Sequence, residues 1–168
     1  MKFLKIFLMV LLVSLFCGSV YAAGSVVEQS RTWTINGDDV VITVKLLCTG
    51  DASAGTVPDF TFTNLDPNRP TPGSLSKQLS LRGSYIIRVE TWPGSPAPDT
   101  YTLKFYSSRG GTEGALLLDI PARSTTDKET ETGSYTLGDW PPVDDGLIMK
   151  TGDLGTDKTT TVYVTFAK

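Results

Sequence analysis

The sequence predicts an all-β protein: an antiparallel β-sandwich of about eight strands, preceded by a helical signal peptide. Beyond residue 22 no segment keeps a helical period, whereas apolar and polar residues alternate with period two in four segments. The chain also holds 16 Gly and 10 Pro residues, which supply turns between short strands. A length of 168 residues suits one domain large enough to bury a two-sheet core.

Residues 1–22 have the pattern of a secretory signal peptide. Two lysines precede an apolar run, and Val20 and Ala22 occupy the −3 and −1 positions of a cleavage site. We therefore expect cleavage after Ala22, one domain of residues 23–168, and a periplasmic or extracellular location with no membrane span after cleavage. The alternative is an uncleaved anchor, but Gly, Ser and Ala dilute the second half of the segment, and a span needs about 20 predominantly apolar residues.

The expected strands follow one another along the rest of the chain, separated by Gly, Pro, Asn and Asp turns. Alternation is clearest in four of them, and the shorter ones fill the gaps between turn signals. They cover residues 26–35, 40–48, 59–65, 84–91, 100–107, 116–120, 147–150 and 159–167. The turns that separate them include Asn36-Gly37-Asp38, Asp66-Pro67-Asn68, Pro93-Gly94, Arg109-Gly110-Gly111 and Asp144-Asp145-Gly146.

The alternation also predicts which side chains form the core. One face of residues 40–48 is entirely apolar and ends at Cys48, which we expect to be buried because a small thiol behaves as a hydrophobic group. In three later strands the same argument places Ile87, Val89, Leu103, Phe105, Val164 and Phe166 in the core. Trp92 falls on the opposite, mixed face, in phase with Arg88 and Glu90.

Residues 123–134, RSTTDKETETGS, interrupt this pattern because they contain no apolar side chain. We expect a polar loop there. As a functional segment it would meet a partner through Arg123, Asp127, Lys128, Glu129 and Glu131; the alternative is a solvated connection.

Composition argues against several functions. The chain has no histidine, which removes the commonest general base and metal ligand. A net charge of −3 argues against nucleic-acid binding. Paired aspartates occur at 38–39, 144–145 and 153/157, but they lie in turn signals and match no calcium loop, and nothing places two of them as a glycosidase pair. We therefore expect no catalytic residue, no metal and no cofactor.

The three tryptophans offer a second function. Exposed Trp rings serve as stacking platforms for sugars, and Trp92 and Trp140 are the candidates for a ligand platform here. The alternative is that each ring caps one end of the core, because Trp is highly buried on average.

Several segments in order resemble a known group of proteins. Residues 83–111 read GSYIIRVETWPGSPAPDTYTLKFYSSRGG, so that a strand ending in RVET leads through the turn PGSPAPD to a second strand. GDASAGTVPDF precedes this unit, and ALLLDIPARSTTDKE and PPVDDGLIMKTGDLGTDKTTTVYVTF follow it. This order is similar to small structural proteins of tailed bacteriophage particles and prophages, over about residues 40–167. The resemblance implies a β-sandwich with an assembly role and no active site. Virion proteins do not normally carry a signal peptide, so the signal peptide suggests either a domesticated copy exported by the host or a shared scaffold used outside the membrane.

Taken together, these observations predict an exported, non-enzymatic structural or binding protein. A protein partner or self-association is expected, and no nucleic acid. The first alternative is a carbohydrate-binding or adhesin-like module that uses Trp92 and Trp140. The second is a small hydrolase built on the aspartate pairs.

Overall fold

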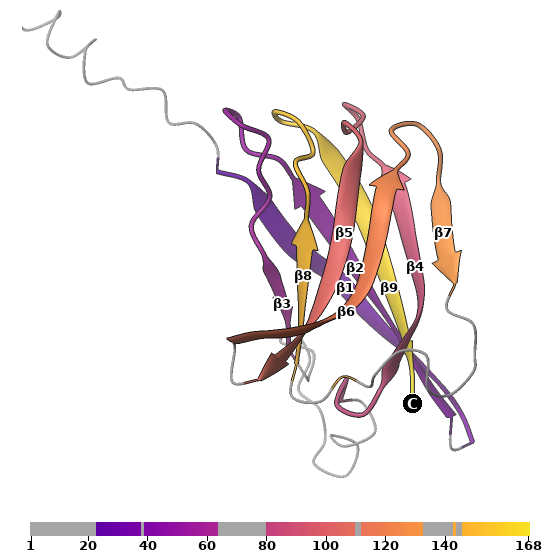
Figure 1. Ribbon diagram of the computed structural model, residues 1–168. Coiled ribbons are helices and arrows are strands. Elements are labelled where there is room, and N and C mark those ends of the chain that lie inside the picture. The colour runs from indigo at the N-terminus through magenta and orange to yellow at the C-terminus, as the bar shows by residue number, and fades with distance from the viewer. Residues whose placement is uncertain (1–22, 38, 64–79, 110–111, 133–142, 144–145) are drawn as a thin grey trace, which may run out of the picture.

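The computed structural model describes residues 23–37, 39–63, 80–109, 112–132, 143 and 146–168, and Figure 1 shows their arrangement. This part of the chain is all-β, with two antiparallel sheets and no helix. The helix predicted for residues 1–22 lies outside the described residues. Among the described residues, no helix has the length and apolar character that crossing a membrane requires.

The first sheet has five strands in the order β1-β2-β9-β4-β7. They are β1 (Ser25–Asn36), β2 (Asp39–Thr49), β9 (Thr159–Ala167), β4 (Tyr85–Pro93) and β7 (Glu129–Thr132). β1 and β2 form a hairpin at Gly37, whose φ of 65° lies in the left-handed region that glycine adopts without steric cost. β2 and β9 lie inside the sheet, where their alternating Val, Ile and Thr side chains suit a pleated surface.

The second sheet has four strands in the order β3-β8-β5-β6. They are β3 (Phe60–Phe62), β8 (Leu147–Thr151), β5 (Tyr101–Arg109) and β6 (Thr112–Arg123). The described residues thus form nine strands where the sequence predicted about eight, the additional one being β7. β3 is shorter than the predicted segment 59–65, and β6 extends beyond 116–120 at both ends.

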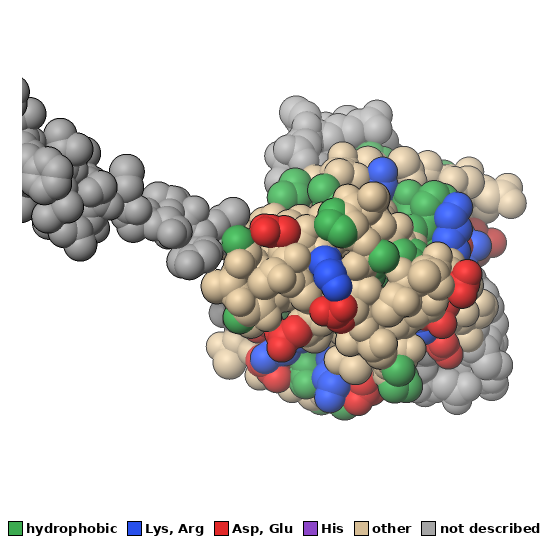
Figure 2. All heavy atoms as spheres, turned by 90° about the horizontal axis from the view of Figure 1, so that it is seen from above, with side chains coloured by type: hydrophobic (Ala, Val, Ile, Leu, Met, Phe, Trp, Pro, Cys, Tyr) green, Lys and Arg blue, Asp and Glu red, His purple; other side chains and the backbone are tan. Residues whose placement is uncertain are grey.

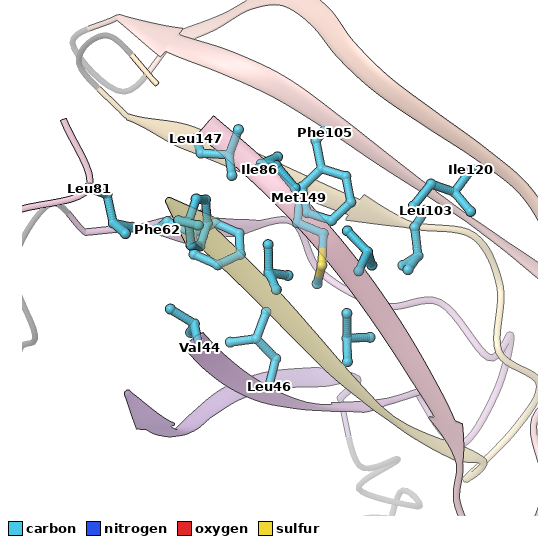
Figure 3. Packing of buried hydrophobic residues seen from close by; sticks show 14 of the residues in the cluster. Val44, Leu46, Phe62, Leu81, Ile86, Leu103, Phe105, Ile120, Leu147 and Met149 are labelled. Atoms are coloured by element: carbon cyan, nitrogen blue, oxygen red, sulfur yellow. The ribbon is translucent and has the colours of Figure 1, made fainter. Parts of the chain in front are cut away.

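The two sheets pack face to face with the apolar core between them (Figure 1). Figure 3 shows side chains from both sheets pointing toward one another, among them Val44 and Leu46 of β2 opposite Phe105 and Met149. Phe62 of one sheet meets Phe166 of the other edge to face, with ring centroids 5.8 Å apart. The predicted burial of Cys48, Val89, Leu103, Phe105, Val164 and Phe166 is confirmed.

The prediction that Ile87 lies in the core is wrong. Its neighbour Ile86 is only 6% exposed, whereas Ile87 is partly exposed. The register between β4 and β9 shifts between Ile86 and Arg88, which marks a β-bulge at Ile87. An extra residue in one strand exchanges the two faces, so alternation counted back from Val89 assigns Ile87 to the wrong side.

The prediction of a polar loop over residues 123–134 is wrong for Arg123 and for residues 129–132. Arg123 ends β6 and is buried, and residues 129–132 form β7, which pairs antiparallel with β4. Only residues 124–128 remain as a connection, and residues 133 and 134 lie outside the described part. A strand without apolar side chains is possible here because β7 lies at the sheet edge, and its inward side chains meet a buried cation rather than the core.

Candidate functional site

The outer face of the five-stranded sheet carries an aromatic pair between two lysines. Trp92 of β4 and Tyr163 of β9 are in contact, with ring centroids 4.8 Å apart and planes tilted by 51°. Lys128 Nζ lies 3.7 Å from the centroid of the Trp92 ring. Lys45 Nζ of β2 lies 5.9 Å from the centroid of Tyr163. We call these four residues the Trp92 row.

Strand register explains how the Trp92 row forms. Lys45 of β2 lies opposite Tyr163 of β9, and Tyr163 lies opposite Glu90 of β4. Trp92 follows two positions along β4, so it shares the face of Glu90 and reaches Tyr163 diagonally. Lys128 comes from the connection between β6 and β7 and covers the far side of the row. The sequence placed Trp92 on this face correctly.

The two rings of the Trp92 row are partly buried, and the row carries two positive charges. Trp92 and Tyr163 are each partly buried, which lowers the entropy that a partner would have to remove on binding. Glu90, which lies opposite Tyr163 in the sheet, forms an ion pair with Arg88 at 3.0 Å. The two lysines make the row positively charged within a protein whose net charge is −3.

Arg123 joins the two sheets at one edge. Its Nε lies 3.2 Å from Glu129 Oε2, its Nη1 lies 3.5 Å from Glu131 Oε2, and Nε also donates a hydrogen bond to Thr91 Oγ1 at 3.2 Å. Nη2 is buried and has no hydrogen-bond partner among the described residues. Arg123 belongs to β6 in one sheet, whereas its partners lie on β4 and β7 in the other.

A second β-bulge, this one in β6, turns Arg123 inward. Strict alternation from the buried Ile120 would point Arg123 to solvent, yet it is 5% exposed. The register between β5 and β6 shifts between Tyr101 and Leu103, where Ala122 has a φ of 36°. The extra residue reverses the face of the strand end, as a bulge does. Arg123, Glu129 and Glu131 therefore pair with one another and lie in strands, not in the loop that was predicted.

The other predicted site residues have different outcomes. Lys128 is exposed and lies on Trp92, so the structure brings these two candidates together. Asp127 is exposed and accepts a hydrogen bond from Thr126 Oγ1 at 3.3 Å. Trp140 lies outside the described residues. Tyr163 and Lys45 were missed as candidates, although alternation placed Tyr163 on the outer face of its strand.

Two groups that could carry chemistry are held in unreactive forms. Burial raises the pKa of the Cys48 thiol to about 12, so it stays protonated and poorly nucleophilic near neutral pH. Hydrogen bonds from Thr56, Ala54 and Ser53 hold the pKa of Asp51 well below its usual range, which makes it a poor general acid. Within the described ranges, no three His, Cys, Asp or Glu side chains gather as a metal site.

Positive and negative side chains are mixed at the end of the molecule that is uppermost in Figure 1. Figure 2 looks onto the end of the molecule that is uppermost in Figure 1, and Lys or Arg side chains alternate there with Asp or Glu. On this visible face no basic area stands apart from acidic neighbours, as a nucleic-acid footprint would.

Comparison with protein-family models gave no match, and no curated protein matches the chain either.

Proposed function

We propose that the protein is an exported, non-enzymatic β-sandwich that serves as a structural or binding subunit. The observation that carries this proposal is the Trp92 row, in which a sheet holds two aromatic rings and two cations toward solvent. Tryptophan and tyrosine are among the side chains that contribute most of the binding energy at protein interfaces. The signal-peptide pattern of residues 1–22 supports export.

The partner is a protein surface or a second copy of the chain. Such an assembly role agrees with the resemblance to structural proteins of tailed phage particles. The lack of histidine and the unreactive states of Cys48 and Asp51 support a role without turnover. Edge strands β1, β3, β6 and β7 add a second route, because an edge can accept a strand from a neighbour.

A carbohydrate-binding role is the second candidate, and the contact between Trp92 and Tyr163 favours it. Two neighbouring rings on a sheet form a platform on which a sugar can stack. Lys128 covers the Trp92 ring, so a sugar that stacks on that side must displace it or pair with it. An acidic sugar fits such a site better than a neutral one.

The experiment uses protein exported and processed from the full chain, with Tyr163→Ala and Trp92→Ala as test variants. Tyr106→Ala is the matched control, because Tyr106 lies 5.4 Å from Lys150 Nζ in a similar lysine–aromatic contact on the other sheet. Light scattering over a concentration series measures self-association, and a glycan array measures sugar binding.

Association that Trp92→Ala and Tyr163→Ala weaken and Tyr106→Ala preserves supports the structural role. Glycan binding with the same pattern supports the second candidate. Association unaffected by all three variants contradicts the assignment of the Trp92 row. Turnover of ester, glycoside or peptide substrates contradicts the absence of catalysis.

A further inference from the structure

The first described residues of the chain lie against the loop that follows β2. A Cβ atom on Gly24 would come within 2.1 Å of the Thr56 carbonyl oxygen and 3.1 Å of the Asp51 nitrogen, so only glycine fits at this position. Ser25 of β1 pairs with Thr49 of β2, and continuing this antiparallel register sets Ala23 opposite Asp51. Figure 1 shows the start of β1 beside this loop, at the upper end of the sheets.

The Asp51 carboxylate is fixed in place by its own loop. Its Oδ1 accepts hydrogen bonds from the Ser53 and Ala54 nitrogens at 2.8 and 2.7 Å and from Ser53 Oγ at 2.7 Å. Its Oδ2 accepts from the nitrogen of Thr56 at 2.9 Å and from the hydroxyl of the same residue. These donors hold the carboxylate ionised and in one orientation.

Asp51 lines an open hollow of about 550 Å³ together with Ala23 and Gly24. The residue that carries the fixed negative charge and the beginning of β1 therefore border the same hollow. A cation that belongs to Ala23 itself would lie within reach of that charge.

We propose that the Asp51 loop receives the α-ammonium group that signal-peptide cleavage creates on Ala23. The inference rests on the proposed export. A host signal peptidase adds water across the Ala22–Ala23 peptide bond: the carbonyl carbon becomes the carboxylate of Ala22, and the nitrogen leaves as the amine of Ala23 and takes up a proton. The new cation would lie beside the Asp51 loop, because Gly24 packs against this loop and Ala23 lines the same hollow as Asp51.

The pairing would stabilise the folded state of the processed chain. Before cleavage the nitrogen of Ala23 is an uncharged amide and has no charge to offer Asp51. After cleavage the ammonium and the carboxylate attract each other, and the start of β1 is tied to β2 at the loop end. The processed chain alone carries this contact.

The test begins with the full chain expressed in a host that exports it. N-terminal sequencing of the exported protein should give Ala23 as the first residue. NMR titration of the Ala23 methyl resonance then measures the pKa of its amine, which should lie about half a unit or more above the usual range of about 7.7–8.0. Asp51→Asn should return it to that range, whereas Asp119→Asn, on the outer side of β6, should leave it raised.

A second measurement needs no substitution, because Asp51→Asn also removes loop hydrogen bonds. Raising the ionic strength from about 0.01 to 1 M shortens the Debye length from about 30 to 3 Å, so an amine pKa raised by Asp51 should fall toward the usual range. An amine pKa already in the usual range at low salt, or one unchanged by Asp51→Asn, would overturn the inference and leave export intact. Exported protein that still begins at Met1 would overturn cleavage and this inference. Recovery of the chain only inside the host cell would overturn the export proposal and this inference together.

Discussion

Lys128 Nζ lies 3.7 Å from the centroid of the Trp92 ring, although Trp92 belongs to β4 and Lys128 comes from the connection between β6 and β7. The contact ties this connection to the outer face of the five-stranded sheet. It is a contact between two candidates that the sequence singled out for different functions, the ring as a sugar platform and the lysine as part of a partner loop. Trp92 and Lys128 therefore lie on the same surface of the protein.

The coupling between Lys128 and Trp92 should be measurable. A cation over a partly exposed ring contributes about 0.5–1 kcal/mol. We expect a double-mutant cycle of Lys128→Ala and Trp92→Leu, measured by denaturant unfolding, to give a coupling free energy of that size. Additive effects of the two substitutions would show that the contact contributes nothing to stability.

Removing Phe105 should cost far more stability than removing its neighbour. Phe105 is 0% exposed in the core between the sheets, so Phe105→Ala should lower the free energy of unfolding by about 3–5 kcal/mol. Lys104 points outward and pairs with Asp119 at 3.4 Å with both side chains exposed, so Lys104→Ala should cost under about 0.5 kcal/mol. Similar costs in urea unfolding would contradict the assignment of faces in β5.

The bulge in β4 predicts a difference between two adjacent isoleucines. Ile86→Ala removes a core side chain and should cost about 2–4 kcal/mol, whereas Ile87→Ala should cost about half of that or less because Ile87 is partly exposed. The same unfolding measurement compares them. A larger cost at Ile87 would mean that strict alternation describes β4 after all.

Arg123 should be more important for stability than an exposed arginine with one partner. Arg123→Ala leaves Glu129 and Glu131 without their buried cation and should cost about 2–3 kcal/mol. The matched control is Arg88→Ala, whose side chain is 48% exposed and pairs with Glu90, with an expected cost below about 1 kcal/mol. Equal costs from thermal unfolding would show that the edge does not depend on Arg123.

The Cys48 thiol should not react with thiol reagents in the native protein, and its ionisation should lower the free energy of unfolding at alkaline pH. Burial raises its pKa to about 12, while an unfolded chain has a thiol pKa near about 8.5. The unfolded state therefore loses its proton first, and the contribution of the neutral thiol to stability falls as pH rises from about 8.5 to 12. An aromatic disulfide reagent at pH 8 should label Cys48 only in denaturant, and rapid labelling of the folded protein would contradict its burial.

Features that depend on a single strand could be predicted from the sequence. Alternation in residues 40–48 and 159–167 predicted the buried faces of β2 and β9, including Cys48, because the pleat points successive side chains to opposite sides whatever the partner strand is. The same local rule placed Trp92 outward. Gly37 marked the turn between β1 and β2, because the backbone preference of glycine is also local.

The tertiary structure alone decided what depends on cross-strand partners. A bulge is set by the register with a neighbouring strand, so alternation misplaced Ile87 and gave no sign that Arg123 turns inward. Residues 129–132 become a strand because they pair with the edge of β4. The residues RSTTDKETETGS by themselves do not predict this pairing. The contacts of Lys128 with Trp92 and of Gly24 with the Asp51 loop join segments far apart in the chain. Their existence depends on strand order, because strand order determines which side chains share a surface.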